Sequence, residues 1–198
     1  SCWAIATVAA ISDRICIASG GRQQPEISVE DALACNGFSD ANCVGSRPDV
    51  AWFYYIREGV VSGGGYGSHR GCRPYSVPGT DPAIDSASTG PTPVCERQCI
   101  DGYNKTYAND KHYGSFVYGF DHKNREVQRE IMTNGPVVAG FAYKSGVYQQ
   151  MTGDIRGGHS VKIIKWGRES GVDYWLVANS WGTKLGDRGF FKIRRGND

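Results

Sequence analysis

Three residues of the types used in nucleophilic catalysis stand far apart in this sequence. Cys2 lies in the first turn of a helical pattern, where unpaired N–H groups and the helix dipole favour a thiolate, the nucleophilic form of cysteine. His159 follows two glycines and opens an apolar run, and its imidazole can take the thiol proton. The side-chain amide of Asn179 can hold that ring in orientation. The three residues together predict a nucleophile, a base and a group that orients the base.

The stretch after Cys2 predicts the helix that must carry it. Apolar residues recur at helical spacing and form one stripe, and Gly20-Gly21 ends the pattern. Asp13 and Arg14 lie off that stripe. The stripe consists of Ala4, Val8, Ile11, Ile15 and Ala18.

Helices are predicted mainly in the first part of the chain and strands in the last part. Ser28-Val29-Glu30-Asp31 is a capping-box pattern that starts a short helix through Leu33, and Pro48 fits the first turn of another. From 61 to 109 regular periodicity disappears, and 78–93 is predicted to be a long exposed loop. The further helices are predicted at 49–58 and 126–133, and the strands at 137–141, 161–166, 173–178 and 189–194.

Three short motifs give the chain a family resemblance. Ser1-Cys2-Trp3-Ala4, Gly157-Gly158-His159 and Asn179-Ser180-Trp181-Gly182, in that order, resemble the papain family of cysteine proteases. Gly71-Cys72-Arg73-Pro74-Tyr75 and Asp110-Lys111-His112-Tyr113-Gly114 narrow the resemblance to the cathepsin B subfamily, and it runs from Ser1 to Asp198. It implies an α+β, papain-like fold: a mainly helical left half at 1–112, an antiparallel, β-barrel-like right half at 113–198, and the active-site cleft between them.

The resemblance implies a cysteine endopeptidase that hydrolyses peptide bonds through an acyl-enzyme. Cys2, His159 and Asn179 would be catalytic, and Trp181 would shield the His–Asn hydrogen bond from water. The segment 74–93 matches the occluding loop, but it contains no histidine, so little dipeptidyl carboxypeptidase activity is expected. The residues matched to substrate-binding positions are Gly45, Ser46, Pro48, Gly140, Gly158, Ser160 and Trp181.

Two other readings of the sequence stay open. The first is a catalytically impaired cathepsin B homologue that binds peptides or protease inhibitors. The second is a secreted structural domain stabilised by disulfides, in which Cys2 would itself be paired. A thiol oxidoreductase is disfavoured because the chain has no C-x-x-C motif.

Seven cysteines indicate an oxidising compartment. With Cys2 free, the other six allow about 15 pairings. The resemblance implies two bonds, Cys35–Cys95 and Cys72–Cys99, and partners upstream of Ser1 for Cys16 and Cys43. A Cys16–Cys43 bond is the alternative. The resemblance also implies that the chain is a fragment, with a zymogen pro-segment, an oxyanion-hole glutamine and a last strand lying outside it.

Composition narrows the range of partners. The chain of 198 residues is 40% hydrophobic, enough for a sizeable core, and its net charge of +2 comes from scattered basic residues, which argues against nucleic-acid binding. No apolar run approaches the roughly 18 residues of a membrane span. The four histidines are scattered, so neither a metal nor another cofactor is expected. We expect a monomer acting on peptide or protein substrates, with cystatin-type inhibitors as partners, in the lysosome or outside the cell; one sequon, Asn104-Lys105-Thr106, fits the secretory route.

Overall fold

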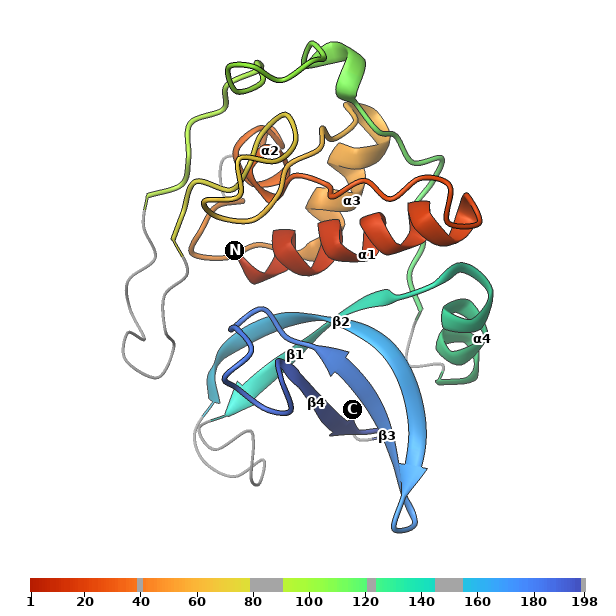
Figure 1. Ribbon diagram of the computed structural model, residues 1–198. Coiled ribbons are helices and arrows are strands. Elements are labelled where there is room, and N and C mark those ends of the chain that lie inside the picture. Colours follow the sequence, from red (N-terminus) through yellow and green to blue (C-terminus); the bar gives the residue numbers. More distant parts are fainter. Residues whose placement is uncertain (39–40, 79–90, 121–123, 145–154, 197–198) are drawn as a thin grey trace.

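The computed structural model describes residues 1–38, 41–78, 91–120, 124–144 and 155–196. Three helices and the long connecting segments lie on one side, and a sheet flanked by a fourth helix lies on the other (Figure 1). The elements are α1 (Cys2–Ala18), α2 (Val29–Ala34), α3 (Pro48–Arg57), the 3-10 helix η1 (Ala108–Asp110), α4 (Asn124–Asn134), β1 (Val137–Lys144), β2 (Ile155–Glu169), β3 (Val172–Ala178) and β4 (Phe190–Arg194).

Helix α1 lies at the boundary between the two sides and packs against α2, α3 and β2. Of the predicted stripe, Ala4, Val8 and Ile11 are buried, whereas Ala18 near the C-terminal end is exposed. Trp3 and Ala10, which lie off that stripe, are also fully buried. A helix that is apolar on most sides is usually surrounded by other elements. The first turns of α1 therefore bury more of their surface than the single predicted stripe.

The local signals for the next two helices are correct. Ser28 caps α2, and its Oγ accepts a hydrogen bond from the Asp31 backbone N–H at 3.0 Å. Pro48 occupies the first position of α3, where a missing N–H costs nothing. Gly59, at φ +71°, follows the end of that helix, in a conformation that glycine adopts without strain.

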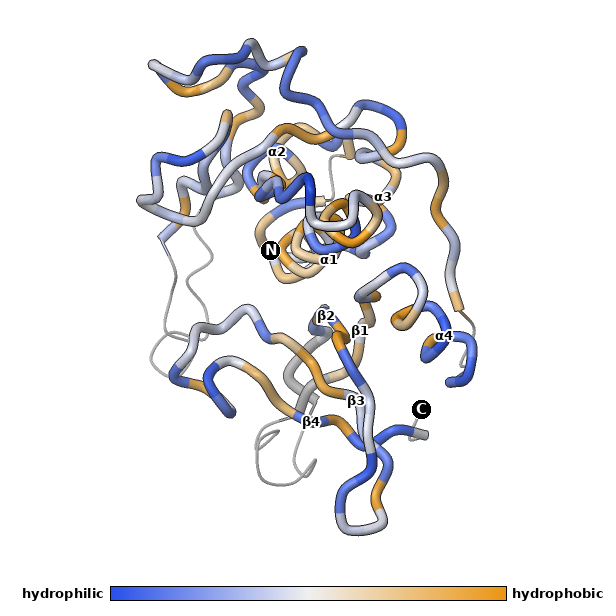
Figure 2. The backbone as a smooth tube through the Cα atoms, turned by 45° about the vertical axis from the view of Figure 1, so that its right-hand side comes forward, coloured by the Kyte–Doolittle hydropathy of each residue, from blue (hydrophilic) through white to orange (hydrophobic). Residues whose placement is uncertain are grey.

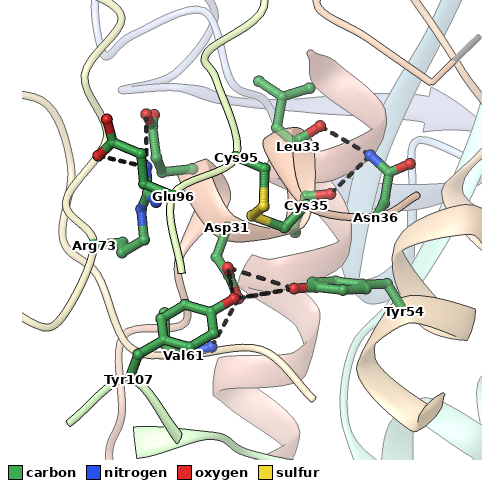
Figure 3. The surroundings of a disulfide bond; sticks show 12 residues. Asp31, Leu33, Cys35, Asn36, Tyr54, Val61, Arg73, Cys95, Glu96 and Tyr107 are labelled. Atoms are coloured by element: carbon green, nitrogen blue, oxygen red, sulfur yellow. Dashed lines mark hydrogen bonds and ion pairs between the residues drawn. A yellow bond between two sulfur atoms is a disulfide. The ribbon is translucent and has the colours of Figure 1, made fainter. Parts of the chain in front are cut away.

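A buried carboxylate joins the helical elements to the segment after η1. Asp31 is fully buried, and its carboxylate accepts hydrogen bonds from Tyr107 and from the Val61 N–H at 3.1 Å (Figure 3). It also accepts a hydrogen bond from Lys111 at 3.3 Å. Burial lowers the pKa of the Lys111 ammonium, and the attraction of Asp31 opposes that effect. Because a buried charge without a partner is costly, this pairing fixes how α2 sits against residues 107–111.

Both disulfides implied by the resemblance are present. Cys35 bonds to Cys95 and Cys72 bonds to Cys99, and Figure 3 shows the first of these beside Asp31. Cys16 and Cys43 are unbonded thiols, so the alternative bond between them does not form. The carbonyl of Cys43 accepts from the Ser1 nitrogen at the N-terminal end of α1. Cys16 lies 15 residues further along the helix, about 22 Å away at 1.5 Å per residue, well beyond disulfide reach.

The sheet is antiparallel, with strand order β1-β2-β3-β4 among the described residues. Hydrophobic stretches alternate with hydrophilic turns along it, as at the turn between β2 and β3 (Figure 2). The prediction that a strand begins at Val161 is wrong, because β2 begins at Ile155. Its first part pairs with β1, with His159 opposite Phe141, and its second part pairs with β3. His159 therefore lies inside a strand held on one side by β1, not at a strand entrance.

Charged side chains of α1 hold the helix to the other side of the molecule. Lys162 of β2 donates to Asp13 at 2.5 Å, and Arg14 pairs with Glu130 of α4 at 2.8 Å. Arg14 Nε also donates to the Pro136 carbonyl at 2.8 Å. The two charges of α1 that lie off the apolar stripe therefore contact the sheet side.

Replacing Glu130 with glutamine is expected to lower the free energy of unfolding by about 1–3 kcal/mol at neutral pH, because its partner Arg14 is then left without a counter-charge. The Glu130 side chain is only 9% exposed. Burial raises the pKa of its carboxyl, but hydrogen bonds from Tyr118, Arg14 and Asn134 outweigh burial and lower it. A lowered folded-state pKa stabilises above the ordinary value of 4.5, and this contribution is lost as the pH falls through the folded-state value.

Urea unfolding of the Glu130→Gln variant, measured at neutral pH and again below the folded-state pKa, tests this. The difference from wild type should shrink in acid. Glu169→Gln, which removes the exposed pair with Lys192, is the matched control and should change stability by less than about 1 kcal/mol. Equal effects of the two substitutions at neutral pH would show that the Arg14–Glu130 contact does not stabilise the fold.

Candidate active site

Cys2 is the first residue of α1, and several contacts fix its position. Ser1 precedes it as the N-cap residue, its nitrogen donates to the Cys43 carbonyl at 2.9 Å, and its hydroxyl lies 3.2 Å from that of Tyr75. The indole of Trp3, fully buried, donates to the Asn42 carbonyl at 3.0 Å. The thiol therefore stands at the end of a helix whose first turn is held by the loop that leads to α3.

His159 is held by hydrogen bonding and by aromatic packing. Its side chain is almost fully buried, and its Nε2 lies 2.8 Å from Oδ1 of Asn179. The ring stacks on Trp181, with centroids 4.3 Å apart and planes 25° apart, and meets Phe141 edge-on. Since an amide oxygen only accepts, Nε2 carries a proton in this contact, and Nδ1 is the nitrogen left for the thiol.

The sheet register explains how these residues meet. Lys162 of β2 pairs with Ala178, the last residue of β3. Because the strands are antiparallel, residues after Ala178 lie beside residues before Lys162. Asn179 and Trp181 are thus brought to His159, and the Asn179 N–H is fixed by the Gly189 carbonyl at 2.9 Å.

The surroundings of Cys2 favour its thiolate. Burial raises the pKa of the thiol, but hydrogen bonds from His159 and from the Ser160 N–H, together with the charge of His159, outweigh it. The result is a pKa of about 7, compared with the ordinary value of 9.0. A base on one side and a backbone donor on the other are the surroundings that activate a cysteine nucleophile.

Alkylation of Cys2 by iodoacetamide is therefore expected to rise with pH around a midpoint of about 7, because only the thiolate reacts. The rate should be nearly constant from pH 8 upwards. Mass spectrometry of the peptide that contains Cys2, at a series of pH values, gives the titration curve. A synthetic peptide with the same sequence around Cys2 is the control and should titrate near 9.0. The same midpoint in protein and peptide would contradict the role given to the surroundings.

Two of the predicted substrate-binding residues lie on β2, on either side of His159 in the chain. Ser160 is buried and donates its N–H to Cys2, a contact that the sequence pattern did not indicate. Gly158 lies on the other side of His159 and pairs with Ala142 of β1. Pro48 belongs to the other side of the molecule, and its carbonyl accepts from Thr7 of α1 at 3.4 Å.

The remaining predicted substrate-binding residues fall in different places. Gly45 and Ser46 precede α3, and the Gly45 N–H is held by the Asn42 side chain at 3.3 Å. Ser46 does not adopt a positive φ. Gly140 pairs with Ser160 but also lines a cavity of about 470 Å³ between residues 116–120, α3, α4 and the sheet. That cavity does not include Cys2, and Arg14 in its wall lies about 18 Å along α1 from it, so it is separate from the catalytic contact.

Most of the predicted occluding loop, residues 79–90, lies outside the described residues. Within the described residues, no group of three His, Cys, Asp or Glu side chains is arranged to hold a metal ion. None of the described helices is both long enough and apolar enough to cross a membrane.

Comparison with known proteins shows the family to which the chain is similar. Residues 1–198 match the family described as papain family cysteine protease. A cathepsin B-like cysteine proteinase of Schistosoma japonicum is 42% identical over 212 residues, which cover 100% of this chain and 62% of that protein. Cathepsin B-like cysteine proteinase 2 of Haemonchus contortus is 45% identical with the same coverage.

Solved structures give the same picture of the fold. Procathepsin B S9 from Trypanosoma congolense superposes with a TM-score of 0.80 at 38% identity, over 98% of this chain and 63% of that one. Digestive procathepsin L2 from Tenebrio molitor larval midgut superposes with a TM-score of 0.67 at 26% identity, over 99% of this chain and 56% of that one. The chain thus spans less than two thirds of the length of these relatives.

Proposed function

The chain belongs to the papain family of cysteine proteases and is cathepsin B-like. From this premise we propose that it hydrolyses peptide bonds. Cys2 would be the nucleophile, His159 the general base and acid, and Asn179 the residue that orients His159. The observation that carries the proposal is the contact of Cys2 with a histidine whose other nitrogen is fixed by Asn179. A nucleophile, a base and an orienting group in that order are what acyl transfer needs.

The reaction proceeds in two halves. The Cys2 thiolate attacks the carbonyl carbon of the peptide bond, and the tetrahedral intermediate collapses as protonated His159 gives its proton to the departing amine. This leaves a thioester on Cys2. His159, now neutral, takes a proton from water as the water oxygen attacks the thioester, and collapse of the second intermediate releases the acid and restores the thiolate–imidazolium pair.

We propose that the first turn of α1 stabilises the negative charge of the tetrahedral intermediate. The first N–H groups of a helix lack the carbonyl of a preceding turn as a partner, and we propose that the N–H of Cys2, the first residue of α1, donates to the oxyanion of the intermediate. Trp181 covers one face of the His159 ring, so the hydrogen bond to Asn179 is shielded from water. Pro48, Gly45 and Ser46 from the helical side, and Gly158, Ser160 and Gly140 from the sheet side, are proposed to bind the substrate.

An irreversible epoxide that reacts with thiols separates the enzyme from an impaired homologue that binds peptides or inhibitors. We expect the epoxide to modify Cys2 and to abolish hydrolysis of a casein substrate together with the labelling. The impaired homologue would bind peptides while Cys2 stays unlabelled and casein stays intact. A structural domain with Cys2 in a disulfide would give no free thiol at Cys2, although the structure has that thiol unbonded.

We propose that the enzyme is an endopeptidase with little dipeptidyl carboxypeptidase activity, because residues 74–93 contain no histidine to bind a C-terminal carboxylate. The expected result is equal cleavage of internal bonds in a peptide with a free C-terminus and in the same peptide with a C-terminal amide. Mass spectrometry of the products over time gives both rates. Stepwise release of C-terminal dipeptides from the free acid alone would overturn the proposal.

We further propose that the protein works as a monomer in the lysosome or outside the cell, with protein substrates and cystatin-type inhibitors as partners. The support is the pair of disulfides, which form and persist in oxidising compartments. Size-exclusion chromatography at several concentrations tests the monomer, and inhibition by a cystatin tests the partner class.

A further inference from the structure

We propose that Asn104 carries an N-linked oligosaccharide. Asn104-Lys105-Thr106 is the one place in the 198 residues where asparagine is followed, two positions later, by serine or threonine with a residue other than proline between them. The proposed peptidase does not use this triplet, so the glycan would be an attribute of the protein separate from its catalysis. Such triplets also arise by chance, and the structure supplies the reasons for taking this one as a modification site.

The side chains around Asn104 leave it turned towards solvent. Tyr103 and Lys105, its neighbours on either side, both donate to Oδ1 of the buried Asp110, at 2.9 and 3.2 Å. Their side chains therefore turn back towards the body of the protein. Asn104 lies between them and is itself exposed to solvent.

Glycosylation of the Asn104 side-chain amide would not break a hydrogen bond to any of the described residues. That amide makes no hydrogen bond to them, whereas the buried Asn36 uses its amide to bond several carbonyls. A bulky, polar oligosaccharide on the Asn104 nitrogen would thus break no contact and bury no polar group. Thr106 is also exposed, and its hydroxyl oxygen accepts from the Asn109 N–H at 3.3 Å, which leaves the hydroxyl proton free to donate.

The segment that carries Asn104 is fixed and lies on the outside of the molecule. The Cys72–Cys99 disulfide and the Ile100 N–H, which donates to the Cys72 carbonyl at 2.9 Å, hold its start. In Figure 1, residues 100–110, drawn in green, run along the outer edge of the helical side, away from the sheet. The glycan would therefore project from a rigid outer surface, remote from the strands that carry His159.

The disulfides connect this geometry to the compartment where glycans are added. The Cys35–Cys95 and Cys72–Cys99 bonds attach the segment just before the sequon to earlier parts of the chain. Disulfides of this kind form in the endoplasmic reticulum, where asparagines in such triplets are also glycosylated. A chain that acquires these bonds is therefore exposed, in the same compartment, to the enzyme that glycosylates asparagines in triplets such as Asn104-Lys105-Thr106.

The test is secretion of the full-length protein from a eukaryotic host, followed by peptide-N-glycosidase treatment. We expect the treatment to increase mobility on a denaturing gel and to convert Asn104 to aspartate, detected by mass spectrometry. Asn104→Gln and Thr106→Ala should abolish the modification at this position and the part of the shift that it causes, while Thr106→Ser should keep both. Asn109→Gln, which changes an exposed asparagine outside any such triplet, is the matched control and should leave the shift intact.

Two outcomes would overturn the proposal: secreted, disulfide-bonded wild type with unmodified Asn104, or a glycosidase shift of the same size in wild type and in Asn104→Gln. Thermal unfolding of each variant shows that it is folded, so loss of the shift reports the site and not misfolding. Hydrolysis of a blocked peptide should be within about twofold of wild type in Asn104→Gln, because surface substitutions away from buried contacts have small effects. The proposal of a glycan and the proposal of peptidase activity are therefore tested by separate measurements, and one can be wrong while the other holds.

Discussion

Replacing Cys2 with alanine is expected to lower kcat for hydrolysis of a blocked fluorogenic peptide by a factor of about 10⁶, the size of the loss when the nucleophile of another triad hydrolase is removed. The reason is that no other described thiol is positioned to replace it. Cys2 is the thiol that contacts His159, whereas Cys43 is buried and Cys16 lies about 21 Å from Cys2 along α1. Steady-state assays of the activated protein give the comparison, and an unchanged KM is the expected companion if peptide binding is intact.

The control for this substitution is Cys16→Ser, which changes a cysteine on the same helix that the proposed chemistry does not use. It should hydrolyse the peptide at close to the wild-type rate once thermal unfolding shows that it is folded. Cys2→Ser is a second comparison, because a hydroxyl of similar size is far less acidic than a thiol with a pKa of about 7. Wild-type activity in Cys2→Ala would remove the proposed mechanism and leave only family membership.

The sequence predicts well the features of this fold that depend on neighbours in the chain. The start of α2 follows from Ser28, and the limits of α3 follow from Pro48 and Gly59, because caps, proline and glycine act over a few residues. The end of α1 after Ala18 follows likewise from Gly20-Gly21. Each of these signals satisfies or removes a backbone hydrogen bond locally, so no distant contact is needed to interpret it.

The extent of β2 could not be predicted in this way. Its first residues include Gly157 and Gly158, which have low strand propensity, and they form a strand because β1 pairs with them. The same holds for Asp13, whose partner Lys162 is 149 residues away. A charge off the apolar stripe is usually solvated, and only the folded chain shows that this one contacts the sheet.

For the candidate site, the sequence indicated residue types but not the contacts between them. Cys2, His159 and Asn179 could be chosen because their side-chain chemistry and sequence context are distinctive. The donation from the Ser160 N–H to the thiol had no sequence signal, because every residue except proline offers the same backbone group. Phe141 meets the His159 ring because the β1–β2 register places them opposite each other, and register is set by the sheet as a whole.

Replacing His159 with alanine is expected to lower kcat by about as much as the loss of Cys2, because residues that act as one unit are not additive. The double variant Cys2→Ala/His159→Ala should therefore be no slower than either single variant. In His159→Ala the pKa of Cys2 should rise from about 7, because both the hydrogen bond and the charge of His159 hold it down. Kinetics of the three variants, with the pH dependence of Cys2 alkylation, measure both effects.

The control for the histidine is His69→Asn, which changes an exposed histidine at φ +52°, a conformation that asparagine also tolerates. It should leave kcat and the Cys2 titration unchanged. Added imidazole should restore part of the activity of His159→Ala, since a free base can enter the space that the ring leaves, but it should restore none in Cys2→Ala. Losses that multiply in the double variant would mean that the two residues act separately, and the thiolate–imidazolium pair would then not be the catalytic unit.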